Sequence, residues 1–383
     1  MRRVLLAIPI VMLSAGAVFA DWKAGVAAYD KGDYTAALAE FQGVLAKSPG
    51  FAGAHLMAGK TLEKLGRSAD ALASFQAAAR LEPGNPRYAY YAANALLDAG
   101  RAGEARSVLE KVELGSLPGK TKSTLLLVGA RAALALDDTA GAIEAAGRAA
   151  EADPASAQAH QFLGFALSRD GRDREAFDAY RRAWSAGGDA AAGRGAVISG
   201  GAAARSVAGR DERLELYTQV AAVAAELAGK TGEADDALLA AEASLGAQRF
   251  DGALAWLDKS GLDTALVGFY KGQCLLGSDA AKAEVQLRRA LAKDPEPRLR
   301  KRIYASLGYA LDVQKRYDDA AEAYRSAGDA AKAAEMKERR EKARQNAAAD
   351  EEQRRIDELN RLLHDYDNLV RPGPPPPVPT PKT

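Results

Sequence analysis

The chain has 383 residues, with 52 Lys or Arg against 51 Asp or Glu, which excludes a nucleic-acid binder that works through a global basic field. A single Cys excludes a disulfide scaffold and any site that needs several cysteine ligands. Alanine accounts for 87 residues, and an alanine-rich, proline-poor body favours helix because Ala loses no side-chain entropy there. The composition therefore predicts an all-α chain.

Residues 1–20 have the features of a secretory signal peptide. Arg2 and Arg3 form a basic start, an apolar run follows from Val4 to Leu13, and small residues precede a cut after Ala20. The apolar run of about ten residues is too short to cross a bilayer of about 30 Å, and no later stretch is long enough. We therefore expect an exported protein without a membrane span. A periplasmic location is favoured, with a secreted or envelope-associated protein as the alternative.

A repeat of about 34 residues follows the leader. Its marker is an alanine followed four residues later by a bulky residue, at Ala37–Phe41, Ala71–Phe75, Ala105–Leu109 and Ala176–Tyr180, with Ala142 in the same place. The stretches Gly25–Pro49 and Gly59–Pro83 carry Gly, Ala, Phe and Pro at identical offsets. Such a period predicts a helix-turn-helix unit that stacks on its neighbours.

These motifs resemble the tetratricopeptide repeat (TPR) family. Gly25/Ala37/Phe41/Pro49 and Gly59/Ala71/Phe75/Pro83 match its pattern, and Leu163-Gly164/Ala176/Tyr180 and Leu307-Gly308/Ala320/Tyr324 match it without the proline. The small residues let paired helices approach closely, the bulky residue fills the space beside them, and proline ends the second helix. The resemblance implies a right-handed superhelical solenoid in which the first helix of each repeat lines a concave groove.

The repeats fall into two blocks. Five clear repeats occupy 21–188 and three looser ones occupy 234–334. The segment 189–233 between them contains five glycines from Gly193 to Gly209, each costing about 1 kcal/mol in a helix interior. We interpret this segment as either a degenerate repeat or a glycine-rich bend.

The C-terminal part, 335–370, predicts a long, charged, amphipathic helix. Residues 335–361 hold eight basic and eight acidic side chains without Gly or Pro. An apolar stripe of two heptads follows, at Ile356, Leu359, Leu363, Tyr366 and Val370. This stripe either folds back to cap the last repeat or forms a coiled coil, making 356–370 a site for homo-oligomers or a partner. The proline-rich tail, 371–383, is expected to be disordered.

No residue pattern predicts an enzyme, a metal site or a cofactor. His55 and His160 hold the same place in two repeats, which is typical of packing residues, and Cys274 is expected to be a buried, inert thiol. Two segments, 115–121 and the one around Lys230, imitate a phosphate-binding loop but have the wrong glycine spacing and follow no predicted strand.

Helical geometry nominates partner-binding residues on the first helices, where the resemblance places the groove. The candidates are Trp22, Tyr29, Lys60, Tyr90, Asn94, Arg131, Gln161, Phe165 and Arg169. Aromatic rings with Arg and Asn suit a peptide or extended protein segment. The sequence thus predicts a non-enzymatic protein–protein interaction scaffold of the bacterial cell envelope. The alternative is a structural oligomeric or glycan-binding component of an envelope assembly or exopolysaccharide export system.

Overall fold

The computed structural model describes residues 7–370, and the surroundings of side chains from 19 to 363. All regular elements in this part of the chain are helices, and it contains no strand, which confirms the all-α fold class. The chain divides into two compact units, residues 1–247 and 248–383, which are described separately. No helix in the described part is long and apolar enough to span a bilayer.

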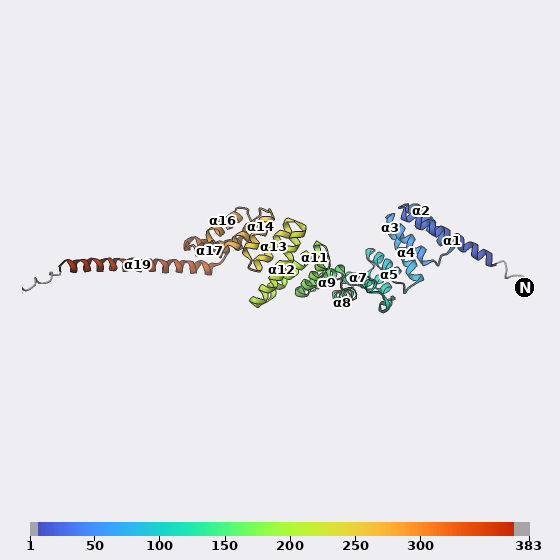
Figure 1. Cartoon of the computed structure of the whole chain (residues 1–383), viewed down its shortest axis with the longest axis horizontal. Helices are drawn as coiled ribbons and strands as arrows, with labels where there is room; N and C mark the ends of the chain where they lie inside the picture. The colour runs from blue at the N-terminus through green and yellow to red at the C-terminus, as the bar shows by residue number, and fades with distance from the viewer. Residues whose placement is uncertain (1–6, 371–383) are drawn as a thin grey trace, which may run out of the picture. The chain divides into compact units, whose positions relative to one another are not determined.

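Unit 1 is a stack of paired helices that follow one another in sequence order (Figure 1). The pairs are α1 (Ala7–Asp30) with α2 (Tyr34–Lys47), α3 (Ala52–Lys64) with α4 (Ser68–Leu81), α5 (Pro86–Asp98) with α6 (Ala102–Leu109), α7 (Gly119–Ala135) with α8 (Thr139–Ala152), α9 (Ala157–Arg169) with α10 (Asp173–Ser185), and α11 (Ala190–Ser206) with α12 (Arg210–Thr231). A short 3₁₀ helix, η1 (Leu114–Ser116), precedes α7, and α13 (Ala234–Gly246) packs on α12.

Unit 2 continues the helical pattern. It contains α14 (Phe250–Lys259), α15 (Ala265–Leu275), α16 (Ala280–Leu291), α17 (Pro297–Val313), α18 (Tyr317–Ala327) and α19 (Ala330–Val370). Within this unit α15 packs on α16, α17 packs on α18, and α19 packs on α18. Stacked helix pairs of this kind confirm the predicted solenoid.

Glycines of the first helices face aromatic rings of the second helices, as the repeat pattern predicts. A Cβ atom added to Gly59 would lie 2.5 Å from the ring of Phe75, which is completely buried. The same arrangement recurs at Gly25 with Phe41, Gly164 with Tyr180 and Gly308 with Tyr324. The missing side chain therefore sets how closely the two helices of a pair approach.

The turn inside each pair also keeps one register. The marker alanine of the sequence repeat, which we call the contact alanine, lies near the start of the second helix. The residue five positions before it has a positive φ at seven turns, and it is Gly32, Gly66, Gly100, Asp137, Gly171, Gln248 or Lys315. Glycine adopts this left-handed conformation without the Cβ clash that other residues meet. The looser repeats around Gln248 and Lys315 thus fold with the same turn as the clear ones, although their sequences lack its glycine.

The glycine-rich segment is helical, so its interpretation as a bend is wrong for residues 190–206. Helix α11 starts at the N-cap Asp189, whose side chain accepts a hydrogen bond from Ala192 N–H. A Cβ on Gly200 would lie 2.5 Å from Val220 and 2.7 Å from Phe177. These glycines allow close helix packing, and the burial they permit offsets their cost of about 1 kcal/mol each.

An ion pair ties α11 to α13 across this segment. Arg194 donates from Nε to Oδ1 of Asp236 at 2.7 Å and from a terminal nitrogen to Oδ2 at 2.9 Å, and it also pairs with Glu233. Thr231 donates its hydroxyl to Asp236 Oδ2 at 2.7 Å. Asp236 is completely buried, and the hydrogen bonds from Arg194, against the opposing effect of desolvation, hold its pKa below the usual range.

Helix α19 caps the last pair with its first turns, while the apolar stripe does not fold back. Ala333 and Met336 are buried at the start of the helix. Ile356, Leu359 and Leu363 are 44%, 59% and 55% exposed, so the capping interpretation of this stripe is wrong. The start of α19 covers the apolar surface of α18 instead, through Ala333 and Met336.

Three parts of the sequence predictions lie outside the described residues. They are the first six residues of the leader, the side chains of Tyr366 and Val370 in the stripe, and the proline-rich tail.

The Gly59–Phe75 contact predicts opposite effects of one substitution at two glycines. Gly59→Ala should lower the free energy of unfolding by about 1–3 kcal/mol, because overpacking against the buried ring exceeds the helix-propensity gain of about 1 kcal/mol. The matched control is Gly147→Ala in α8, where nothing lies within 4 Å of an added Cβ, and it should be neutral or stabilising. Thermal unfolding followed by far-UV circular dichroism measures both, and equal stabilisation of the two variants would contradict the close-approach argument.

The buried Asp236 predicts an acid-dependent loss of stability. Its folded-state pKa is lower than its unfolded value of about 3.9, so its contribution is present above that value and is lost as the pH falls through the folded pKa. Asp236→Asn should therefore lower the free energy of unfolding at neutral pH. The difference in this free energy between wild type and Asp236→Asn should become smaller below about pH 4. The control is Asp235→Asn at the neighbouring exposed position, and denaturant unfolding at several pH values measures all three proteins. A constant difference between wild type and Asp236→Asn over this range would rule the linkage out.

Candidate functional site

The first helices of successive pairs approach one another more closely than the second helices do. Contacts between first helices join α1 to α3, α5 to α7, α7 to α9, α9 to α11 and α11 to α13 in unit 1, and α15 to α17 in unit 2. Second helices of neighbouring pairs have no contact of comparable extent in the described part of the chain. In a curved stack the closer elements lie on the inner side, so the first helices form the inner face, as the resemblance implied.

One position of each first helix marks this inner face. It lies eleven residues before the contact alanine of the second helix, and we call the residues there in the first five pairs the inner-face stripe, which consists of Val26, Lys60, Asn94, Arg131 and Phe165. Two members of the stripe contact each other across neighbouring pairs, because Arg131 on α7 donates a hydrogen bond to Oδ1 of Asn94 on α5 at 2.6 Å. Four of the five residues are predicted partner-binding candidates.

Lys60 lies between two aromatic rings. Its Nζ is 5.6 Å from the ring centroid of Tyr29 on α1 and 5.6 Å from that of Tyr91 on α5. Neither a hydrogen bond nor an ion pair holds this ammonium group within the described residues, so its contacts are cation–π contacts. The structure thus brings the predicted residues Tyr29 and Lys60 together and adds Tyr91.

The prediction chose Tyr90, but Tyr91 is the ring beside Lys60. Tyr91 also stacks on Phe75, with ring centroids 5.4 Å apart. Tyr90 is half-buried and packs against two buried apolar clusters, one that includes Ala93 and Ala105 and one that includes Ala89 and Leu125. Tyr91 and Tyr90 precede Asn94 by three and four residues, each about one helical turn, so the sequence spacing alone does not choose between them.

A second polar group surrounds Asn94 and Arg131. The amide of Asn94 donates to the carbonyl oxygen of Tyr90 at 2.9 Å, and Arg131 lies 3.7 Å from Asp98. Burial, and then the charge of Asp98, raise the pKa of Glu63 on α3 above its usual range. The inner face from α1 to α7 therefore presents two cations and two acids in a mixed, half-exposed patch.

The remaining candidates lie farther along the chain or in the core. Gln161 donates to Asp189 at 3.1 Å, and Phe165, 46% exposed, lies beside Phe162. Arg169 is exposed and has no ion pair within the described residues. Trp22 belongs to the core instead, because its ring packs on Phe41 and Phe51 at 5.5 and 5.0 Å.

The histidines and the cysteine have structural surroundings. His55 and His160 each place Nε2 within hydrogen-bond distance of the carbonyl oxygen of the preceding proline, Pro49 at 2.9 Å and Pro154 at 3.0 Å. Burial raises the pKa of the Cys274 thiol to about 11, which makes it a poor nucleophile. Among the described residues no group of His, Cys, Asp or Glu could hold a metal ion.

Two family models described as tetratricopeptide repeat match the chain, at residues 28–73 and 56–119. Residues 28–119 therefore consist of tetratricopeptide repeats. The matched region covers α2 to α6, which includes the Lys60 and Asn94 positions of the inner-face stripe. Proteins built from TPRs generally mediate protein–protein interactions and are typically not enzymes.

Several solved structures of TPR proteins are similar to the chain. MamA from Desulfovibrio magneticus RS-1 is 20% identical, with 44% of this chain and 94% of that chain covered and a TM-score of 0.40. The pilF protein of Pseudomonas aeruginosa is 16% identical, with 62% and 98% covered and a TM-score of 0.45. A TPR protein from Parabacteroides merdae is 14% identical, with 77% and 99% covered and a TM-score of 0.40. No curated protein matches the chain at a significant level.

Proposed function

We propose that this TPR protein is a non-enzymatic scaffold of the bacterial cell envelope that holds an extended segment of a partner protein on its inner face. The observation that carries the proposal is the patch around Lys60 and Arg131. There, two cations, two tyrosine rings and an asparagine amide lie on neighbouring first helices without forming a catalytic arrangement.

The chemistry of this patch suits a peptide that carries a carboxylate. Lys60 has only aromatic contacts, and the guanidinium of Arg131 is 45% exposed beside Asn94. Acidic groups of a partner can therefore pair with both cations, while Asn94 can exchange hydrogen bonds with a peptide main chain. Glu63 and Asp98 would disfavour a partner with a uniformly high negative charge, which makes the site selective.

The proposed location rests on the leader. Residues 1–20 combine a basic start, a short apolar run and small residues before a cut between Ala20 and Asp21. A cleaved leader would deliver the helical repeats to the periplasm, where a peptide-binding face could join components of an envelope assembly.

The rings that could stack on a glycan are Trp22, Tyr29 and Tyr90, and each is already in contact with other side chains. Trp22 packs on Phe41 and Phe51, Tyr29 contacts Tyr34 and Lys60, and Tyr90 meets the ring of Tyr91 edge-on. We therefore retain a protein segment as the proposed ligand.

A second candidate function, a structural homo-oligomer, is favoured by the exposed stripe of α19. Ile356, Leu359 and Leu363 recur at spacings of 3 and 4, and Leu362 is 62% exposed beside them. These four large apolar side chains on an otherwise charged helix favour burial against a second copy of the same helix. The seam is short, so the oligomer would be weak and would depend on protein concentration.

Reversing the charges of Lys60 and Arg131 should strongly weaken partner binding. We expect Lys60→Glu combined with Arg131→Glu to reduce recovery of partner proteins from envelope fractions about tenfold or more, because both charge pairs become repulsive. The matched control is Arg182→Glu on α10, an exposed arginine on a second helix. Quantitative mass spectrometry of proteins retained by each variant provides the measurement. A set of retained proteins that is the same for the double variant and the control would refute the inner-face site.

The α19 stripe should control the molar mass in solution. Wild-type protein is expected to exceed the mass of one chain at high concentration, and Ile356→Glu with Leu363→Glu should return it to that mass, because charges on the seam oppose helix association. Arg361→Glu, which changes the charge but not the stripe, serves as the control. Size-exclusion chromatography with light scattering decides the question, and a wild type that stays monomeric over the whole concentration range would eliminate this function.

A further inference from the structure

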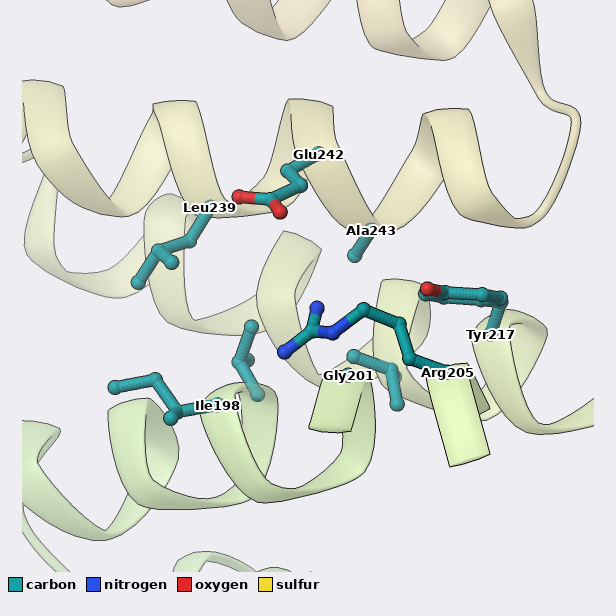
Figure 2. Close-up of a pocket in the computed structure, with 9 residues that line it drawn as sticks. Ile198, Gly201, Arg205, Tyr217, Leu239, Glu242 and Ala243 are labelled. Carbon is teal, nitrogen blue, oxygen red and sulfur yellow. The ribbon is translucent and has the colours of Figure 1, made fainter. Parts of the chain in front are cut away.

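A small pocket lies between α11, α12 and α13, far along the sequence from the patch around Lys60. Its volume is about 120 Å³ (Figure 2). The walls are the aliphatic side chains of Val197, Val220 and Leu239, and Ile198 forms an exposed rim that is 60% accessible. The pocket lies within unit 1, where α11 and α13 contact each other and both pack on α12.

The size of the pocket determines what it can hold. Pockets for drug-sized or cofactor-sized molecules usually measure about 300–1,000 Å³, more than twice this volume. An apolar cavity of about 150 Å³ in a protein core accepts benzene. A pocket of about 120 Å³ therefore suits one aliphatic side chain rather than a free metabolite.

Two opposite charges flank the apolar pocket. Figure 2 shows the guanidinium of Arg205, from α11, and the carboxylate of Glu242, from α13, extending over the same space. Neither side chain has an ion pair or hydrogen bond to another side chain within the described residues, whereas Arg106, Arg194 and Arg316 are each paired with an acid. Glu242 also lies eleven residues before Ala253, which is the position of Lys60 relative to Ala71.

We propose that this pocket anchors an extended segment of a second protein. The segment inserts one leucine-sized aliphatic side chain between Val197, Val220 and Leu239, and it sets a carboxylate against Arg205. A main-chain N–H of the same segment donates to Glu242. An apolar hole beside an unpaired cation and an unpaired anion is complementary to an aliphatic residue followed by an acidic one in an extended chain.

This inference deepens the proposed scaffold function by naming a sequence preference of the partner. It depends on residues of α11–α13 and not on Lys60 or Arg131. A test with short peptides that is read out at the pocket can therefore succeed or fail independently of the partner-capture experiment.

Isoleucine methyl groups report directly on the pocket. The chain has only six isoleucines, of which Ile198 alone lines the pocket, and the others are Ile8, Ile10, Ile143, Ile303 and Ile356. The full-length protein, labelled at isoleucine δ1 methyl groups, is titrated with acetyl-Gly-Leu-Asp-Gly-amide up to about 10 mM, well above the Kd of about 1 mM expected for one anchored side chain. We expect the Ile198 signal to shift, while Ile143, Ile303 and Ile356 stay unchanged.

Two altered peptides test the two halves of the proposal. Replacing the leucine of the probe by alanine should weaken binding about tenfold, because most of the buried apolar area is lost. Replacing its aspartate by asparagine should weaken binding about threefold, as expected for an exposed charge pair. In Arg205→Gln protein the aspartate and asparagine peptides should bind equally, and the exposure of Arg205 makes this variant a safe one for folding.

Filling the pocket provides the last control. Ala243→Leu places a larger side chain into the cavity and should abolish the shift of the Ile198 signal. If Ala243→Leu does not fold, the peptide comparison in Arg205→Gln protein still tests the proposal. An Ile198 methyl that does not respond to the leucine peptide would overturn the pocket assignment. An unchanged preference for aspartate in Arg205→Gln protein would overturn the role of the guanidinium.

Discussion

The close approach of a first helix to its second helix is the constraint on which the rest of the structure depends. Each approach requires a residue without a side chain, as at Gly59, and a buried ring above it, as at Phe75. Because this contact fixes the rotation of the first helix, it also fixes which of its residues face inward. The inner-face stripe is therefore a consequence of packing, since every member sits eleven residues before the contact alanine.

The same constraint explains how repeats that lack the turn glycine still form the same turn between their helices. Around Gln248 and Lys315 the turn keeps its positive φ without glycine, at a cost of about 1 kcal/mol or more for each residue. Packing of the helices on either side offsets that cost. In the glycine-rich segment the ion pair between half-exposed Arg194 and buried Asp236 joins α11 to α13, where small side chains bury less apolar surface.

Sequence reasoning predicts the features that repeat, and it misses those that depend on neighbours in space. The Gly–ring contacts, the helix pairs and the packing role of His55 follow from one period of about 34 residues. The helix at 190–206 could not be predicted from this period. Composition shows that glycine destabilises a helix, but it does not show the contact between Gly200 and Val220 that offsets this cost. Adjacent residues differ by about 100° around a helix, so choosing Tyr91 over Tyr90 required the rotation that only packing sets.

Glycine in a first helix thus has two consequences that depend on the side it faces. Where it faces the second helix, as Gly200 does toward Val220 of α12, it allows close contact and stability. Where it borders the inner side, as Gly201 does, it leaves space, and the pocket beside Arg205 is the result. In the pairs from α3 to α8, residues larger than glycine, such as Lys60 and Arg131, occupy the inner face. Their side chains place positive charges there. Under the proposed function, the two halves of unit 1 would present different chemistry to a partner, an electrostatic patch in the earlier pairs and an apolar anchor between α11, α12 and α13.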